Sequence, residues 1–168
     1  MKACVHRLAV ALLAWVALGL CGCATRSGQA VPNLAIVAPG IYRGGQPTAE
    51  GWQTLVALGV TNVVKLNTGN DADAERLGLV VHRFPISGWE QMCAGVPQDR
   101  LDAACDLLTP GTYVHCLHGQ DRTGLVVASY RVRSGWSHKE AEAEMLRLGF
   151  HPLLVGLWQT WVAHRQAK

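Results

Sequence analysis

The side chains best suited to chemistry lie in one stretch, His115–Gly124, which reads His-Cys-Leu-His-Gly-Gln-Asp-Arg-Thr-Gly. A nucleophile, Cys116, is followed there by a cation, Arg122, with five residues between them. A loop of this composition at the start of a helix turns consecutive backbone N–H groups inward, and the helix N-terminus reinforces their positive character. The stretch therefore predicts a cradle for a phosphate dianion.

The polar residues and glycines of this stretch each have a use in such a cradle. The N–H dipoles and Arg122 favour the thiolate of Cys116, which is the nucleophilic form. The planar fork of Arg122 can bind two phosphate oxygens, more strongly as charge develops on them. Thr123 can donate a hydroxyl hydrogen bond to the sulfur as it leaves in a second step. Gly119 permits the backbone angles of a tight loop, and Gly124 permits close packing at the helix start.

The elements that position this stretch alternate between strand and helix patterns. Strands are predicted at Ile41–Arg43, Asn62–Leu66, Leu79–Phe84 and Tyr113–His115. Helices are predicted after Thr48, from Pro97 to Leu108, from Thr123 to Ser134, and from the Ser137/Glu140 capping box to Gly149. This order predicts an α/β fold with a mostly parallel central sheet flanked by helices, and with the Cys-x5-Arg loop between a strand and a buried helix.

The loop resembles the signature of the cysteine-dependent protein tyrosine and dual-specificity phosphatases, in particular their small exported bacterial members. Tyr42–Pro47 and Tyr130–Trp136 also resemble segments of such domains, and the resemblance covers Pro39 to Phe150. It implies that Cys116 is the nucleophile, that Arg122 binds phosphate, and that Thr123 assists the leaving sulfur. It also implies that His115 supports the thiolate. The residues expected to bind substrate are Leu117, His118, Gly119, Gln120, Asp121 and Arg122.

The general acid departs from the family pattern. Family members place an Asp in a mobile loop about thirty residues before the Cys, but the corresponding stretch here, residues 85–92, contains none. Glu90 in that stretch and Asp121 in the signature are equal candidates, ahead of Asp71 and Asp99. A further alternative is that aryl esters need no acid, because their leaving group departs easily.

The expected reaction is two-step phosphomonoester hydrolysis without metal or cofactor. Leu117, His118 and Gln120 stand where phosphoinositide or inositol phosphate phosphatases often carry Lys, which favours phosphotyrosine proteins, whereas Asp121 favours the lipid-directed relatives. A phosphate-binding pseudophosphatase is the non-catalytic alternative, although Cys116, Arg122 and Thr123 are intact. A sulfurtransferase is a weaker alternative because its cysteine loop is usually shorter. No His/Cys spacing predicts a zinc site.

Residues 1–22 predict a signal peptide. Lys2 and Arg7 precede an apolar stretch, Leu8–Leu20, which at thirteen residues is shorter than the roughly 20 that a membrane-spanning helix needs. Leu20-Cys21-Gly22-Cys23 resembles a bacterial lipobox, so we expect lipid at Cys23 and a location on the periplasmic side of the cell envelope. The alternative is a soluble exported protein. Removing these residues takes away Lys2 and Arg7 and lowers the formal net charge from +3 to +1, which gives no basis for nucleic-acid binding.

The mature chain is predicted to consist of a flexible tether, residues 23–38, and one phosphatase domain, residues 39–168. Cys93 and Cys105 permit a disulfide across a short loop, but Cys105 also shares a helical face with core residues, which is the favoured interpretation. Leu154, Leu157, Trp158 and Trp161 form an apolar stripe. A terminal helix that closes the core is favoured over a docking or membrane-binding helix.

Overall fold

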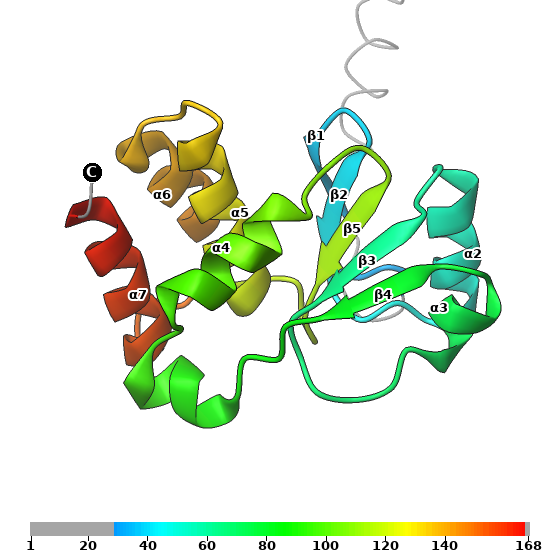
Figure 1. The fold of residues 1–168 in the computed structure, drawn as a ribbon, viewed down its shortest axis with the longest axis horizontal. Helices are drawn as coiled ribbons and strands as arrows, with labels where there is room; N and C mark the ends of the chain where they lie inside the picture. Colours follow the sequence, from blue (N-terminus) through cyan, green and yellow to red (C-terminus); the bar gives the residue numbers. More distant parts are fainter. Residues whose placement is uncertain (1–28, 167–168) are drawn as a thin grey trace, which may run out of the picture.

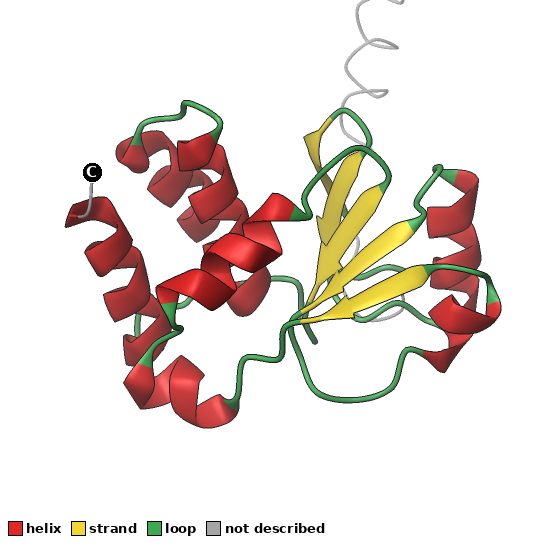
Figure 2. Cartoon of the chain, viewed as in Figure 1, coloured by secondary structure: helices red, strands yellow, loops and turns green. Residues whose placement is uncertain are grey.

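The computed structural model describes residues 29–166 of the 168-residue chain and contains a sheet with helices on both faces (Figures 1 and 2). The strands are β1 (Ala35–Ala38), β2 (Ile41–Gly44), β3 (Asn62–Lys65), β4 (Val80–Arg83) and β5 (Thr112–His115). Their order is β1-β2-β5-β3-β4, in which β1 pairs antiparallel with β2 and the other neighbours pair in parallel. The predicted fold class is confirmed.

Helices cover the sheet in two groups, with α2 and α3 on one face and α4 to α7 on the other (Figure 1). The helices are α2 (Ala49–Ala57), α3 (Ala72–Arg76), the π-helix η1 (Glu90–Ala94), α4 (Gln98–Asp106), α5 (Asp121–Arg133), α6 (His138–Arg147) and α7 (Val155–Gln166). Each face has its own apolar core, which includes Trp52 and Leu55 on one side and Leu125 and Trp161 on the other. The buried helix α5 thus forms the centre of the larger core.

Several helix ends lie where the sequence predicts them. The Thr48 hydroxyl accepts a hydrogen bond from the Gly51 N–H at 3.2 Å, which caps α2. Ser137 and Glu140 form the predicted capping box of α6, and Gly149 follows that helix with a φ of 91°. Helix α5 begins at Asp121, slightly before the predicted start at Thr123.

The predicted tether of residues 23–38 is wrong for its second half. Ala35–Ala38 forms the edge strand β1, and Val31 is buried against the core on the α2 face. The backbone of Ala30 accepts a hydrogen bond from the Thr48 N–H at 2.9 Å. The apolar Ala-Ile-Val-Ala segment extends the sheet instead of linking it to a membrane. Residues 23–28 of the predicted tether, including Cys23, and the predicted signal peptide lie outside the described residues.

The favoured interpretation of Cys105 is confirmed. Cys93 is exposed, Cys105 is buried, and neither forms a disulfide in the described part of the chain. Cys105 packs in the core with Leu101 and Leu108, and burial raises the pKa of its thiol to about 12. This cysteine is therefore a small core residue.

The terminal helix α7 closes the core, as predicted. Leu157 and Trp161 are fully buried, and Leu154 and Trp158 are partly buried against the same core. Among residues 29–166, no helix is long and apolar enough to cross a membrane.

Candidate active site

The signature loop joins β5 to α5 at the carboxyl edge of the parallel strands, and it packs directly on the end of β2. Gly119 has a φ of 74°, and a Cβ at this position would overlap the backbone of Gly44. The Gln46 N–H donates to the Leu117 carbonyl at 2.9 Å. The segment that follows β2 therefore supports the loop from behind, which explains why both segments contain glycines.

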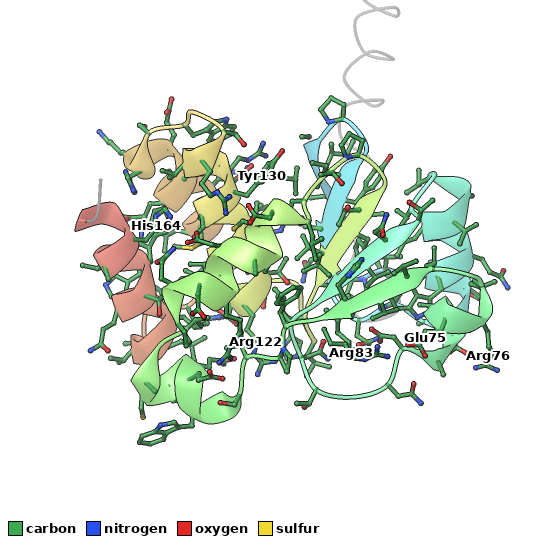
Figure 3. All side chains as sticks on the ribbon, viewed as in Figure 1. Glu75, Arg76, Arg83, Arg122, Tyr130 and His164 are labelled. Carbon is green, nitrogen blue, oxygen red and sulfur yellow. The ribbon has the colours of Figure 1, made fainter. Side chains whose placement is uncertain are left out.

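Cys116 is 4% exposed and lies at a pocket of about 260 Å³. The Gly119 N–H donates a hydrogen bond to its Sγ at 3.3 Å. Arg122 lies where the sheet edge meets the start of α5 (Figure 3). The residues that line the pocket are Gln91, Cys116, Leu117, His118, Asp121 and Arg122.

Most of the predicted site residues thus meet at one place. Gly119 contributes its N–H, as the cradle requires. Among the residues predicted to bind substrate, Gln120 is the exception, because its side chain packs at Gly149 and does not line this pocket.

Arg43 is a functional residue that sequence reasoning missed. It is 2% exposed on β2, and its Nη2 donates to the carbonyls of Gly119 at 2.8 Å and Gln120 at 3.5 Å. Burial lowers the pKa of Arg43 to about 10. The guanidinium holds the carbonyls of Gly119 and Gln120, while the N–H of Gly119 points to the Cys116 sulfur. An Arg within a short buried strand was the available indication, since buried charges need partners.

A buried polar network lies beneath Cys116. His115 Nε2 lies 3.2 Å from Asp71 Oδ2, and His115 Nδ1 lies 3.2 Å from the Cys116 carbonyl. Asp71 Oδ1 accepts hydrogen bonds from Lys65 Nζ and Gln46 Nε2, each at 2.8 Å. Burial alone would raise the pKa of Asp71, but hydrogen bonds from His115, Lys65 and Gln46 outweigh it and hold that pKa well below its ordinary value.

Aromatic rings fix His115 from the sides. Tyr113 stacks on the imidazole with ring centroids 5.4 Å apart, and Trp52 meets it edge-on at 5.6 Å. The Tyr113 hydroxyl donates to the Gly45 carbonyl at 2.5 Å. His115 is therefore held firmly beside Cys116, and Asp71 is the partner that the sequence did not identify. The support of the thiolate by His115 stays a prediction.

Thr123 and Arg122 each bury a polar atom, Oγ1 and Nε respectively, that forms no hydrogen bond within residues 29–166. The predicted bond from Thr123 to Cys116 Sγ is thus not formed in this structure. It stays a prediction for the step in which the sulfur leaves.

Both carboxylate oxygens of Glu90 are bound by neighbouring residues. Its Oε2 accepts from the Ser87 N–H at 2.7 Å, and its Oε1 pairs with Arg100 Nη1 at 2.6 Å. Burial would raise the pKa of Glu90, but these contacts outweigh it and lower the pKa below its ordinary value. Asp99 is exposed on α4. Neither carboxylate lines the Cys116 pocket.

Asp121 is the candidate acid that lines the pocket, as the first residue of α5. Its Oδ1 accepts from the backbone N–H and from Nδ1 of His151, each at 2.9 Å. This oxygen is therefore occupied by one neighbour, and Oδ2 is the oxygen that remains for chemistry.

The wall that contributes Gln91 is held by α7. Gly156 packs so closely against η1 that a Cβ there would overlap the Glu90 carbonyl oxygen. The Thr160 hydroxyl accepts from the Val96 N–H at 2.8 Å just beyond η1. The sequence did not predict that the last helix would support the pocket wall. Within residues 29–166, no group of three or more His, Cys, Asp or Glu could hold a metal ion.

This α/β fold, with a thiol, an Arg and a backbone N–H directed at the thiol in the loop between β5 and α5, defines a cysteine-based phosphatase domain of the protein-tyrosine-phosphatase type. Residues 37–136 match the family described as "Polymorphic toxin system, DSP-PTPase phosphatase", and the chain belongs to that family.

Relatives of known name fall into two groups. The chain is 32% identical over 140 residues to the dual specificity protein phosphatase TpbA of Pseudomonas aeruginosa PAO1, covering 76% of this chain and 62% of that protein. It is 29% identical over 113 residues to the inositol diphosphatase DSP2 of Oryza sativa subsp. japonica, covering 62% of this chain and 55% of that protein. The chain thus spans little more than half the length of the rice relative.

Solved structures have the same fold. The crystal structure of P. aeruginosa TpbA superposes with a TM-score of 0.67 at 26% identity and covers 85% of this chain and 98% of that chain. The catalytic domain of the phosphatase SIW14 from S. cerevisiae superposes with a TM-score of 0.63 at 21% identity, covering 74% of this chain and 80% of that chain. The second match supports the fold alone.

Proposed function

We propose that this protein hydrolyses phosphomonoesters through a phosphocysteine on Cys116, without metal or cofactor. The observation that carries the proposal is the pocket in which the Cys116 Sγ accepts the Gly119 N–H beside Arg122 and Asp121. A pseudophosphatase would bind phosphate there without turnover. The intact set of Cys116, Arg122 and Thr123 favours an enzyme.

The reaction has two displacements at phosphorus. In the first, the Cys116 thiolate forms an S–P bond while the P–O bond to the leaving group breaks, and Arg122 and the loop N–H groups bind the equatorial oxygens. In the second, water forms a new P–O bond and the S–P bond breaks. The hydroxyl of Thr123 then donates to the departing sulfur.

Asp121 is the group that we propose for proton transfer. Its carboxyl gives a proton to the leaving oxygen in the first step and takes one from the attacking water in the second. Asp121 lines the pocket, whereas both Glu90 oxygens are occupied by Ser87 and Arg100. Proton donation matters most when the leaving oxygen is basic.

The dependence of the rate on the leaving group distinguishes Asp121 from Glu90 as the general acid. We expect Asp121→Asn to slow an alkyl phosphate about 10²–10⁴-fold and a nitrophenyl ester far less, with loss of the basic limb of the pH–rate profile. Glu90→Gln is the matched control and should slow both substrates alike. The opposite result would assign the acid to Glu90, and no selective loss in either variant would remove Asp121 from this role.

The proposed substrates are phosphotyrosine proteins, and the proposed enzyme type is a protein tyrosine or dual-specificity phosphatase. Leu117 and His118 line the pocket together with Arg122, and Leu117 is 54% exposed, so the pocket offers apolar surface to an aryl ring. An inositol diphosphate carries more phosphate charge than a phosphotyrosine and favours sites with several cations. The rice relative is named as an inositol diphosphatase. The structure of TpbA in complex with pTyr supports the choice of phosphotyrosine.

A substrate panel tests this choice. Purified protein in EDTA should hydrolyse phosphotyrosine peptides with a higher kcat/KM than an inositol diphosphate, and Leu117→Lys should shift the ratio toward the inositol compound. A higher kcat/KM for the inositol compound in the wild type would reverse the assignment. Vanadate binding without any turnover would support the pseudophosphatase.

We also propose that the protein is exported and anchored by lipid at Cys23 on the periplasmic face of the envelope. Support comes from the lipobox-like Leu20–Cys23 and the basic and apolar residues before it.

A further inference from the structure

His151 makes two contacts to one oxygen of Asp121. Its backbone N–H and its ring Nδ1 both lie 2.9 Å from Asp121 Oδ1, while the ring itself is 63% exposed. Because Oδ1 accepts hydrogen bonds whether or not Oδ2 carries a proton, the Nδ1 that faces it acts as the donor. His151 lies beyond the residues matched by the family model, which end at 136.

The segment that carries His151 is fitted to the start of α5 at successive positions. A Cβ at Gly149 would press on the Gln120 side chain, and Phe150 is buried against Gly124. His151 then reaches Asp121, one residue after Gln120 in the loop. The turn after α6 and the first turn of α5 therefore hold His151 in place, even though its ring is largely exposed.

We propose that His151 is a positioning residue that acts through Asp121. Its two N–H groups hold Oδ1, so that Oδ2 faces the reacting atoms. In the first step the Oδ2–H bond breaks as the leaving oxygen gains the proton, and in the second Oδ2 takes a proton from the attacking water. This inference rests on the proposed function and names a residue that the signature does not contain.

Substitutions that imitate one ring nitrogen at a time test the contact. The amide nitrogen of Asn occupies the place of Nδ1, whereas that of Gln reaches the place of Nε2. We expect His151→Ala and His151→Gln to lower kcat for an alkyl phosphate on the order of tenfold while a nitrophenyl ester and the KM values change little. His151→Asn should restore the alkyl phosphate rate. Equal losses on both substrates, or no rescue by Asn, would overturn the proposal.

A double-mutant cycle shows whether His151 acts through Asp121 alone. His151→Ala should have no further effect in the Asp121→Asn background, and an additive loss there would contradict the inference. A wild type with no Cys116-dependent hydrolysis would instead defeat the proposed function itself.

The tautomer of the His151 ring can also be measured without an activity assay. NMR of its nitrogens at about pH 8, above the ordinary pKa of histidine, should report the Nδ1–H tautomer in the wild type and its loss in Asp121→Ala. An Nε2–H tautomer in the wild type would overturn the contact.

Discussion

Asp71 is the residue on which the support of the nucleophile converges. It is buried between Lys65, at 2.8 Å, and His115, at 3.2 Å, and His115 directly precedes Cys116 in the chain. A buried ion pair that loses one partner leaves the other charge uncompensated, which usually costs about 3–5 kcal/mol. The sequence could not reveal this pairing, because Asp71 and His115 are 44 positions apart and only the sheet brings them together.

We expect Asp71→Asn to lower the free energy of unfolding at neutral pH by about 3 kcal/mol, because it removes the partner of buried Lys65. The pKa of Asp71 is lowered in the folded state, so its stabilising effect is complete above the unfolded value of about 4 and is lost as the pH falls below it. Urea denaturation of the wild type and the variant from about pH 7 down to about pH 3, a range that includes the ordinary Asp pKa of about 4, measures both effects. Asp73→Asn, in an exposed pair with Arg76, is the matched control, and equal losses in the two variants would contradict the network.

Gly119 tests the close packing of the loop on β2. We expect Gly119→Ala to lose vanadate binding and to lower kcat/KM on the order of 10²-fold, since a Cβ would displace the loop from Gly44. Gly78 has a similar φ of 81° with no neighbour near its Cβ position, so Gly78→Ala carries the same backbone strain alone. Isothermal titration with vanadate compares the two. Equal binding by both variants would show that the packing does not shape the site.

Elements with strong local patterns were predictable, and those defined by tertiary contacts were not. The buried helix α5 and the capping box of α6 follow directly from residue types and spacing. Helix α3 has only five residues and η1 only five, too few for a periodic pattern. Strand β1 lies within the predicted tether, because four residues beside Pro, Gly and Asn resemble a linker. At the site, the loop residues were identified, whereas Arg43, Asp71 and His151 contribute through contacts distant in sequence.

The close packing of η1 on α7 predicts that α7 positions the pocket wall. Gly156→Ala should push η1 away from α7 and move Gln91, which lines the pocket, so that kcat/KM falls about tenfold. Gly88→Ala, which lies just before η1 and has open space at its Cβ position, is the control and should keep wild-type kinetics. Steady-state assays with an aryl phosphate decide between them. Normal activity in Gly156→Ala would mean that α7 does not position the wall.

The whole molecule combines a folded phosphatase domain with an N-terminal segment that only the sequence describes. Because β1 and Val31 belong to the fold, any tether after Cys23 is short. A lipid on Cys23 would then hold the domain close to the membrane surface.

Lipid attachment is tested by partitioning of the native protein expressed in a bacterial host. We expect wild type to enter the detergent phase and to carry lipid by mass spectrometry, because each buried methylene contributes about 0.8 kcal/mol. Cys23→Ala should stay in the aqueous phase or remain unprocessed. Cys21→Ala is the control and should partition like the wild type, and both variants should keep the fold. Identical partitioning of wild type and Cys23→Ala would remove the anchor.

The covalent intermediate tests the central claim most directly. Enzyme in EDTA is mixed with labelled phosphotyrosine peptide, quenched in acid during turnover, digested and sequenced by mass spectrometry. The account predicts phosphate on the sulfur of Cys116 in the wild type, and neither label nor turnover in Cys116→Ser, which should still bind vanadate. Phosphate on another residue, or undiminished turnover by Cys116→Ser, would contradict it.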